Sequence, residues 1–171
     1  LEILKKYPLS IFQNEWNGFS KQREFAIGKA EHDWVLSLDA DERCSPELES
    51  EIRSILKSNI TVNGFFIPRK SFFLGKWIKH CGWYPDHQMR FFNKGIVSIT
   101  DRLVHEGFKV TGATCKLKSN IIHYAVRSVS EYTEKINKYS ALSAMEKAGG
   151  KKITMSYLFI KPFFEFKKKF I

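Results

Sequence analysis

The sequence has few of the features that mark disulfide-rich, zinc-binding or membrane-spanning proteins. Its 171 residues include only three cysteines, Cys44, Cys81 and Cys115, which lie far apart and form no Cys-x-x-Cys pair. A small, odd number of cysteines argues against a disulfide framework, and the missing pair argues against a zinc site. We therefore expect three reduced thiols. No apolar run is long enough to cross a bilayer, and no internal repeat is visible.

Acidic residues are also scarce. The chain has 18 Asp and Glu against 28 Lys and Arg, a formal net charge of +10. This balance indicates an anionic partner such as nucleic acid, a phosphorylated glycan or an acidic membrane. Hydrophobic residues make up 43% and aromatic residues 15%, enough to fill one core and too many for a disordered chain. We expect one domain over residues 1–150 and a basic, aromatic tail over residues 151–171.

The first half predicts a helix, a buried strand and a second helix. Ser20 can cap a helix over residues 20–31, and the apolar run 34–38 resembles a strand buried on both faces. Ser45 precedes Pro46 and two early glutamates, which is a strong helix start. The face of that helix expected in the core consists of Leu48, Ile52, Ile55 and Leu56.

The second half predicts short strands over residues 64–69, 88–93 and 115–124, with a long loop or irregular hairpin over 71–85. A last helix begins at Ser128, with Glu131 in a capping box, and stops at Gly149-Gly150. The residues that this helix should bury are Val129, Tyr132, Ile136, Tyr139 and Leu142. The order of elements indicates an α/β fold.

Asp39 and Asp41 are the strongest chemical signal. They leave the apolar strand two residues apart, so both carboxylates can point at one place, where a hard cation needs oxygen ligands. Open α/β sheets also bind their ligands at this end of their strands. A metal there could bridge the two phosphates of a nucleotide-sugar. The alternative is an acidic loop that caps the following helix.

Three linked motifs carry a family resemblance: residues 34–42 (WVLSLDADE), 82–92 (GWYPDHQMRFF) and 104–106 (VHE). Together they resemble family 2 glycosyltransferases, most closely the lipopolysaccharide-core β-glucosyltransferase-like subgroup. The resemblance implies a GT-A fold, a Rossmann-like mixed sheet flanked by helices. It also implies an inverting mechanism, a nucleotide-sugar donor and a divalent metal, Mg²⁺ or Mn²⁺. On this reading the chain starts after the family's N-terminal nucleotide-binding portion, and Asp39 and Asp41 fall on its D-x-D motif.

Inverting transfer needs a general base that accepts the proton of the acceptor hydroxyl. Asp86 is the first candidate, in an aromatic loop four residues before Arg90, which could bind a phosphate or hold the carboxylate. Glu106 is the second, with His105 beside it as a substrate-binding candidate. Asp86 could instead be a turn residue, and Glu106 a surface ion-pair partner.

The remaining candidate residues each have a functional and a structural explanation. His123 matches the late histidine that many GT-A enzymes place on the metal, although a lone histidine beside a strand is more often structural. Asp39, Trp83 and Tyr84 are expected to bind substrate, the two aromatic residues by stacking on sugar faces, as Trp77 also could. Core packing explains the aromatic residues as well. The remaining histidines are interpreted as surface residues: His32, His80 and His87.

The tail over residues 151–171 interleaves lysines with phenylalanines, as do helices that lie in a membrane interface. Pro162 should interrupt a single straight helix. We expect a protein at the cytoplasmic, inner face of the membrane, close to a lipid-linked glycan acceptor. The alternative is a helix that packs on another part of a longer protein.

Two other functions compete with the glycosyltransferase. The charge and aromatic content suggest a nucleic-acid-binding module, but no nucleic-acid-binding pattern is recognisable and an acidic loop repels phosphate unless it carries a metal. We therefore expect no nucleic acid among the partners. The other alternative is an inactive remnant of a glycosyltransferase.

Overall fold

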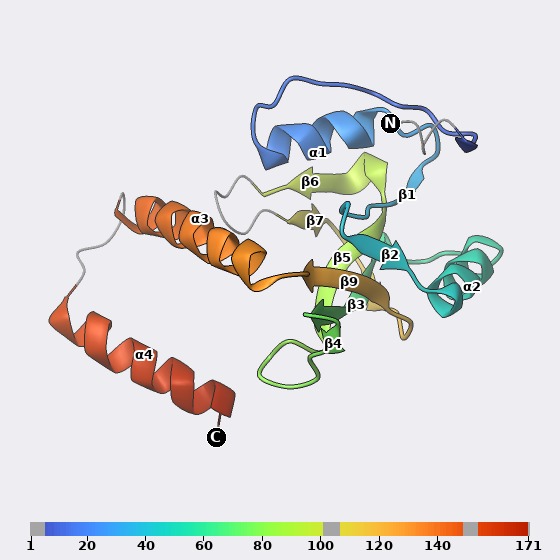
Figure 1. Ribbon diagram of the computed structural model, residues 1–171. Helices are drawn as coiled ribbons and strands as arrows, with labels where there is room; N and C mark the ends of the chain where they lie inside the picture. The colour runs from blue at the N-terminus through green and yellow to red at the C-terminus, as the bar shows by residue number, and fades with distance from the viewer. Residues whose placement is uncertain (1–5, 101–106, 149–153, 171) are drawn as a thin grey trace.

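A mixed β-sheet with helices on both faces forms the body of the protein (Figure 1). The computed structural model describes residues 6–100, 107–148 and 154–170. The helices are α1 (Phe19–Gly28), α2 (Pro46–Leu56), α3 (Val129–Ala148), α4 (Met155–Phe170) and the short 3-10 helix η2 (Lys94–Ile96). The strands are β1 (Trp34–Leu36), β2 (Glu42–Cys44), β3 (Gly64–Phe73), β4 (Lys76–Trp77), β5 (Asp86–Asn93), β6 (Val97–Ile99), β7 (Phe108–Val110), β8 (Thr114–Lys116) and β9 (Ile121–Val126).

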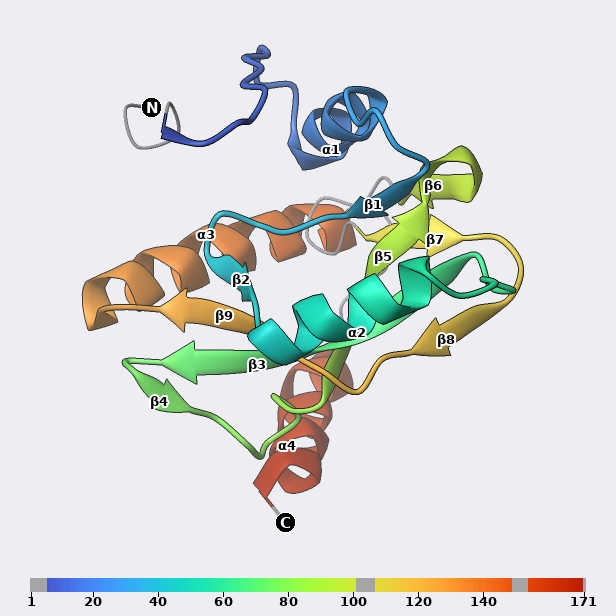
Figure 2. The same cartoon turned by 90° about the vertical axis from the view of Figure 1, so that its right-hand side faces the viewer.

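The main sheet has the order β1-β5-β3-β9-β2, and β4 and β8 also pair with β3. β3 runs parallel to β8 and β9 and antiparallel to β4 and β5, while β6 and β7 form a separate antiparallel pair. The predicted α/β class with a mixed sheet flanked by helices is therefore confirmed. β1 lies at one edge of this path and β2 at the other, so the segment between them crosses the end of the sheet (Figure 2).

The core lies between α2 and the sheet. Leu48 and Ile52 of α2 pack in one buried cluster with strand residues and Leu117. Trp34 adds an aromatic group, with its ring centroid 4.9 Å from that of Phe91. The buried strand residues of this cluster are Phe65, Ile67, Phe91 and Ile121. Burial of such apolar side chains contributes about 1.5–3 kcal/mol each, so this cluster fixes the sheet on which the site is built.

The helix predictions were correct for α2 and less accurate elsewhere. Ser45 caps α2 through a 3.2 Å hydrogen bond from the Leu48 amide, although Leu56 is exposed. The N-cap of α1 is Gly18, not Ser20, so this helix has no side-chain cap. The φ of 94° at this position suits glycine. α4 continues through Pro162, which was expected to interrupt it.

The predicted buried face of α3 is wrong. Val129, Tyr132, Ile136 and Tyr139 are exposed and Leu142 is half-buried, because α3 lies beside β9 along cavities and not against the core. Its start is as expected, since the Glu131 amide donates to the Ser128 hydroxyl and the Glu131 carboxylate accepts from the Arg127 amide.

Three strand predictions also change. The strand expected over residues 34–38 and buried on both faces is β1, which is half-buried because it lies at an edge of the sheet. The single strand expected over residues 115–124 is two strands, β8 and β9, because both pair with β3 at different points along it. The loop expected over 71–85 begins as a continuation of β3 and includes the short strand β4. All three cysteines are free thiols, as predicted.

Candidate active site

The loop between β1 and β2 carries Asp39 and Asp41 across the end of the sheet. The Ser37 amide donates to the Arg90 carbonyl of β5 at 2.8 Å, which anchors the start of the loop. The Tyr124 amide of β9 donates to the Asp41 carbonyl at 2.9 Å, which anchors its end. The loop is therefore tied to two different strands of the sheet.

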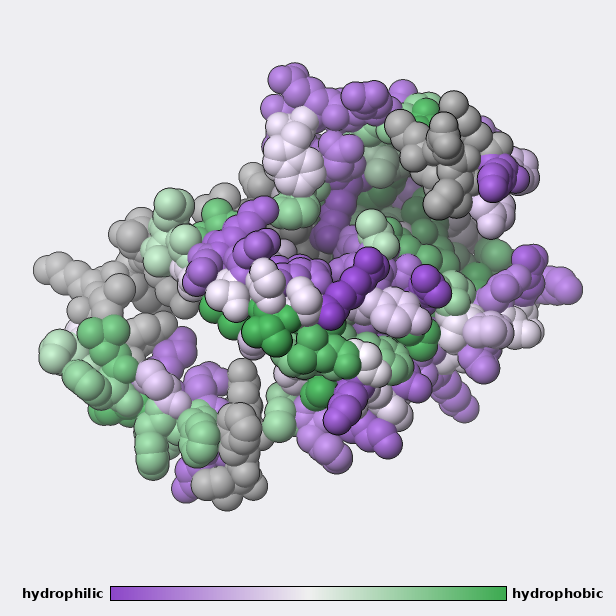
Figure 3. Space-filling model, viewed as in Figure 1, coloured by the Kyte–Doolittle hydropathy of each residue, from purple (hydrophilic) through white to green (hydrophobic). Residues whose placement is uncertain are grey.

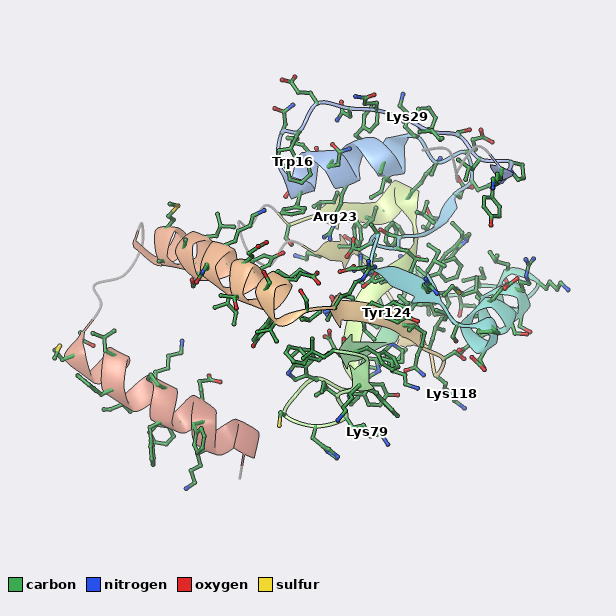
Figure 4. All side chains as sticks on the ribbon, viewed as in Figure 1. Trp16, Arg23, Lys29, Lys79, Lys118 and Tyr124 are labelled. Carbon is green, nitrogen blue, oxygen red and sulfur yellow. The ribbon has the colours of Figure 1, made fainter. Side chains whose placement is uncertain are left out.

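The Asp39 carboxylate lies between two arginines. Arg90 Nη2 donates to Asp39 Oδ2 at 2.5 Å, and Arg23 Nη2 of α1 donates to Oδ1 at 3.4 Å. In Figure 4 the side chain of Arg23 extends from α1 toward the strands. Burial raises the pKa of Asp39, but the hydrogen bond and charge of Arg90 and the charge of Arg23 outweigh it, so its pKa lies below the usual value. Asp39 is therefore ionised at neutral pH.

The Asp41 carboxylate faces His123 of β9. Asp41 Oδ2 lies 3.4 Å from His123 Nε2 and 4.0 Å from Lys135 Nζ. The hydrogen bond from His123 lowers the pKa of Asp41, burial opposes this, and the charges of His123 and Lys135 lower it further. The other imidazole nitrogen, Nδ1, lies 3.0 Å from the Ser71 hydroxyl of β3. Ser71 thus fixes the ring so that Nε2 points toward Asp41.

The Asp86 carboxylate, at the start of β5, is held by neighbours on β3 and β5. Arg69 donates to Asp86 Oδ2 from Nη2 at 2.6 Å and from Nε at 3.0 Å. Gln88 Nε2 donates to Asp86 Oδ1 at 2.6 Å. Two donors of one guanidinium on one carboxylate make a strong, oriented pair. Asp86 is therefore immobilised at the surface of a cavity.

Three cavities meet around Arg69, which lines all of them. The large cavity, about 870 Å³, lies between α1, α3 and the sheet and includes Arg23, Asp39, His87 and Arg90. The aromatic cavity, about 560 Å³, includes Ser71, Cys81, Trp83, Asp86, His123 and Glu165. The bridging cavity, about 390 Å³, includes Asp39, Asp41, His123, Tyr132, Lys135 and Tyr139. Asp39 and Asp86 therefore open onto different cavities that share one arginine.

The comparison with known proteins decides the family. The family described as Glycosyl transferase family 2 matches residues 1–111 of this chain, more than half of its length. The chain belongs to glycosyl transferase family 2.

Curated relatives of this family-2 chain are also named glycosyltransferases. A lipopolysaccharide core biosynthesis glycosyltransferase, LpsC, of Rhizobium meliloti is 25% identical over 146 residues, which cover 81% of this chain and 52% of that protein. An uncharacterised glycosyltransferase of Rickettsia prowazekii is 26% identical over 192 residues, 96% of this chain and 63% of that protein. The chain thus spans between half and two thirds of the length of these relatives.

The structure brings most of the predicted site residues of this family-2 chain near one another. Trp83 lines the aromatic cavity with Asp86, and Tyr84 packs edge-on against Trp77 at 5.3 Å. Arg90 is buried, and its hydrogen bonds go to Asp39 and Glu42, so the carboxylate that it holds is not that of Asp86. The remaining two candidates, His105 and Glu106, lie outside the described residues.

Of the three predicted metal ligands, Asp39 faces two arginines, whereas Asp41 and His123 face each other. The structure therefore does not point both aspartates at one place. Members of the family commonly use a divalent metal, which Asp41 and His123 could hold. Their facing atoms, 3.4 Å apart, open onto the bridging cavity, and Ser71 orients the imidazole from behind. Residues 6–100, 107–148 and 154–170 contain no cluster of three metal-ligating side chains. Mg²⁺ is usually bound by one or two carboxylates together with substrate phosphates and water, so the Asp41 carboxylate fits this pattern, whereas the imidazole of His123 is a less usual ligand for it.

Sequence reasoning missed three residues of this site. Arg69 and Glu42 join the two sides of the site, and His87 lines the large cavity although it was interpreted as a surface residue. One signal was available for Arg69, namely a basic residue within the apolar run of β3 (GFFIPRKSFF). For His87 the sequence offers no comparable signal.

Proposed function

We propose that the full-length protein is an inverting glycosyltransferase that moves a sugar from a nucleotide-sugar to a membrane-associated glycan. The observation that carries this proposal is the grouping of Asp39, Asp41 and Asp86 around Arg69, on cavities that meet at that residue. Family membership supports the reaction class. The acceptor is proposed to be a lipopolysaccharide core or a similar cell-surface glycan, in keeping with the name of the Rhizobium meliloti relative.

On the donor side, we assign Asp41 and His123 to the metal and Asp39 to the donor. The bound metal would supply positive charge to the leaving diphosphate. Arg23 and Arg69 line the large cavity and add positive charge to its walls, which favours an anionic ligand there. Arg90 acts behind Asp39 by holding its carboxylate in place.

On the acceptor side, Asp86 is the proposed base. Its Oδ2 atom accepts two hydrogen bonds from Arg69 and its Oδ1 atom accepts one from Gln88, so one lone pair, on Oδ1, remains for a substrate hydroxyl. Trp83 in the same cavity offers an apolar face to a sugar ring. Asp86 would take the hydroxyl proton as the oxygen attacks the anomeric carbon.

α4 supports a location at the inner face of the cytoplasmic membrane. Figure 3 shows hydrophobic side chains gathered on this helix, at the lower left. Lys161 and Lys167 are exposed among them. No helix in the described part of the chain is long and apolar enough to cross a membrane. The exposed apolar residues of α4 are Met155, Leu158, Phe159, Ile160, Phe163, Phe164 and Phe166.

The test is a donor screen on the full-length protein with its native glycolipid, Mg²⁺ or Mn²⁺, and UDP-glucose, UDP-galactose, UDP-N-acetylglucosamine or GDP-mannose. Mass spectrometry should detect one sugar added to the glycolipid with one donor. Absence of any product would contradict transfer from these four donors and favour the inactive remnant. Tight nucleic-acid binding that weakens steeply with salt would favour the nucleic-acid module.

A further inference from the structure

The Glu42 carboxylate lies at the centre of the site, fully enclosed. Its side chain is 0% exposed, whereas those of Asp39 and Asp86 are 38% and 30% exposed. Glu42 is the first residue of β2, directly after the acidic loop, and pairs with His123 of β9. An ionised carboxylate is costly to bury unless charged donors surround it. The burial of an ionised Glu42 therefore requires its charged partners, and the positions of those partners depend in turn on Glu42.

Both carboxylate oxygens of Glu42 accept hydrogen bonds. Oε1 accepts from Arg90 Nη2 at 2.9 Å and from Arg69 Nη1 at 3.4 Å. Oε2 accepts from the backbone amide of Asp39 at 3.0 Å. Only a carboxylate accepts on both sides, since the amide of glutamine would turn a donor toward one of these donors. Aspartate, one methylene shorter, has less reach toward the three partners.

Glu42 thereby connects the two sides of the site. Through the Asp39 amide and Arg90 it fixes the donor-side carboxylate, because Arg90 Nη2 also donates to Asp39. Through Arg69 it reaches Asp86, because the same guanidinium that contacts Glu42 with Nη1 holds Asp86 with Nη2 and Nε. No other carboxylate in the described residues is recorded in contact with both arginines.

We infer that Glu42 is a positioning residue that acts through Arg69 and Arg90 to set Asp86 and Asp39 at their relative places. This inference rests on the proposed function. Glu42 itself is enclosed and lines none of the three cavities. Displacements of about 1 Å in a catalytic group can lower a rate roughly a hundredfold, so loss of the Glu42 charge should reduce turnover although the fold persists.

The kinetic test uses the full-length protein and the donor that the screen above identifies. Glu42→Gln should lower kcat about a hundredfold, and Glu42→Asp should restore part of it. The matched control is Glu49→Gln on α2, where the carboxylate is 59% exposed and pairs only with Arg53 four residues on. A kcat for Glu42→Gln within threefold of this control would overturn the inference.

A double variant separates positioning from general damage. Arg69→Lys keeps a cation beside Asp86 but lacks the fork that reaches both carboxylates. Because Glu42 also acts through Arg90, the loss in the double variant Glu42→Gln/Arg69→Lys should exceed that of either single variant but fall well short of the product of the two losses. Losses that multiply in full would overturn the inference. If Glu42→Gln does not fold, Glu42→Asp replaces it in the same comparison.

A measurement without substrate keeps this test independent of the proposed function. The side-chain Nε–H of Arg69, hydrogen-bonded to Asp86, should give a protected ¹⁵N nuclear magnetic resonance signal, assigned by its loss in Arg69→Lys. Glu42→Gln should shift or broaden this signal, and Glu49→Gln should not. An unchanged signal would overturn the inference, whether or not the protein turns over a donor. A changed signal without turnover would contradict only the proposed function.

Discussion

Asp86 is held before any substrate binds, by three hydrogen bonds from Arg69 and Gln88. In its proposed role as the base, a carboxylate that is already oriented needs no reorganisation during the reaction, which is how positioned groups lower a barrier. The same contacts restrict which oxygen lone pairs remain for the acceptor. Asp39 is likewise paired with Arg90 of β5, and Asp41 with His123 of β9 and Lys135 of α3. At the scale of single residues, the site consists of carboxylates whose directions are fixed.

Asp86→Asn should lower kcat at least a hundredfold and leave donor binding nearly unchanged, because a general base contributes roughly 10²–10⁴ and acts in the transition state. Steady-state kinetics and calorimetric donor titration would measure the two effects. Glu106→Gln is the comparison variant. A large loss in Glu106→Gln, with Asp86→Asn nearly silent, would transfer the role of base to Glu106.

Asp41→Asn should lower activity at least a hundredfold and weaken Mn²⁺ binding, because charge stabilisation of a leaving group is worth several kcal/mol. Asp39→Asn should lower activity as much. Electron paramagnetic resonance of Mn²⁺ would measure the metal affinity. Asp33→Asn, an exposed residue just before β1, is the matched control. Unchanged Mn²⁺ affinity in Asp41→Asn would refute its assignment as a ligand.

Acid should destabilise the protein through Asp39 and Asp41. Their pKa values are lower in the folded protein than the ordinary value of 3.8, so folding favours the ionised forms. This stabilisation is present above the unfolded pKa and is lost as the pH falls through the folded values. The urea concentration at the midpoint of unfolding should therefore decrease when the pH is lowered below about 4. The variant Asp39→Asn/Asp41→Asn should show a smaller fall, and an equal fall would contradict the assignment.

Elements whose signals are local were predictable, and elements defined by packing were not. α2 was predictable because its cap and its apolar face both come from one short segment, Ser45 to Ile52. The face of α3 was not, because its apolar spacing suits a core while the helix lies along cavities. The position of Asp39 and Asp41 directly after a strand was predictable, but their different partners were not, because these come from distant parts of the chain. Arg69 and Glu42 were not, because their pairing joins residues 27 apart.

Ser45→Ala should lower the unfolding free energy by about 1 kcal/mol, since it removes the side-chain cap of α2. α2 carries two residues of the core, so the loss should extend to the whole domain. Chemical denaturation would measure it. Ser20→Ala is the control, because α1 has no side-chain cap and that change should be nearly silent. Equal effects of the two variants would contradict the assigned caps.

Across the whole molecule, the net charge of +10 and the exposed apolar side chains of α4 act together. The net charge attracts the protein toward an acidic surface over a distance of about a Debye length. Apolar side chains act only on contact. The two contributions therefore respond differently to salt, which makes them separable.

Removal of residues 151–171 should abolish binding to vesicles that contain anionic lipid. Each basic residue near such a surface contributes about 1 kcal/mol, and the phenylalanines add apolar burial. Co-sedimentation of the intact protein should increase with anionic lipid and decrease, without vanishing, at high salt. Equal sedimentation of the truncated protein would show that α4 packs on another part of the protein.

The acidic loop joins the two edges of the sheet, and this has a consequence for the order of events during biosynthesis. Asp41 and Glu42 meet their partners only after β5 and β9 have been made, because Arg90 lies 48 residues beyond Glu42 and His123 pairs with Glu42 from later still. Such long-range closure is the slow part of folding. A nascent chain thus carries Asp39 and Asp41 early, but the contacts of the candidate site form only once β9 has paired with β2 and β3. The candidate site should therefore be completed late in folding.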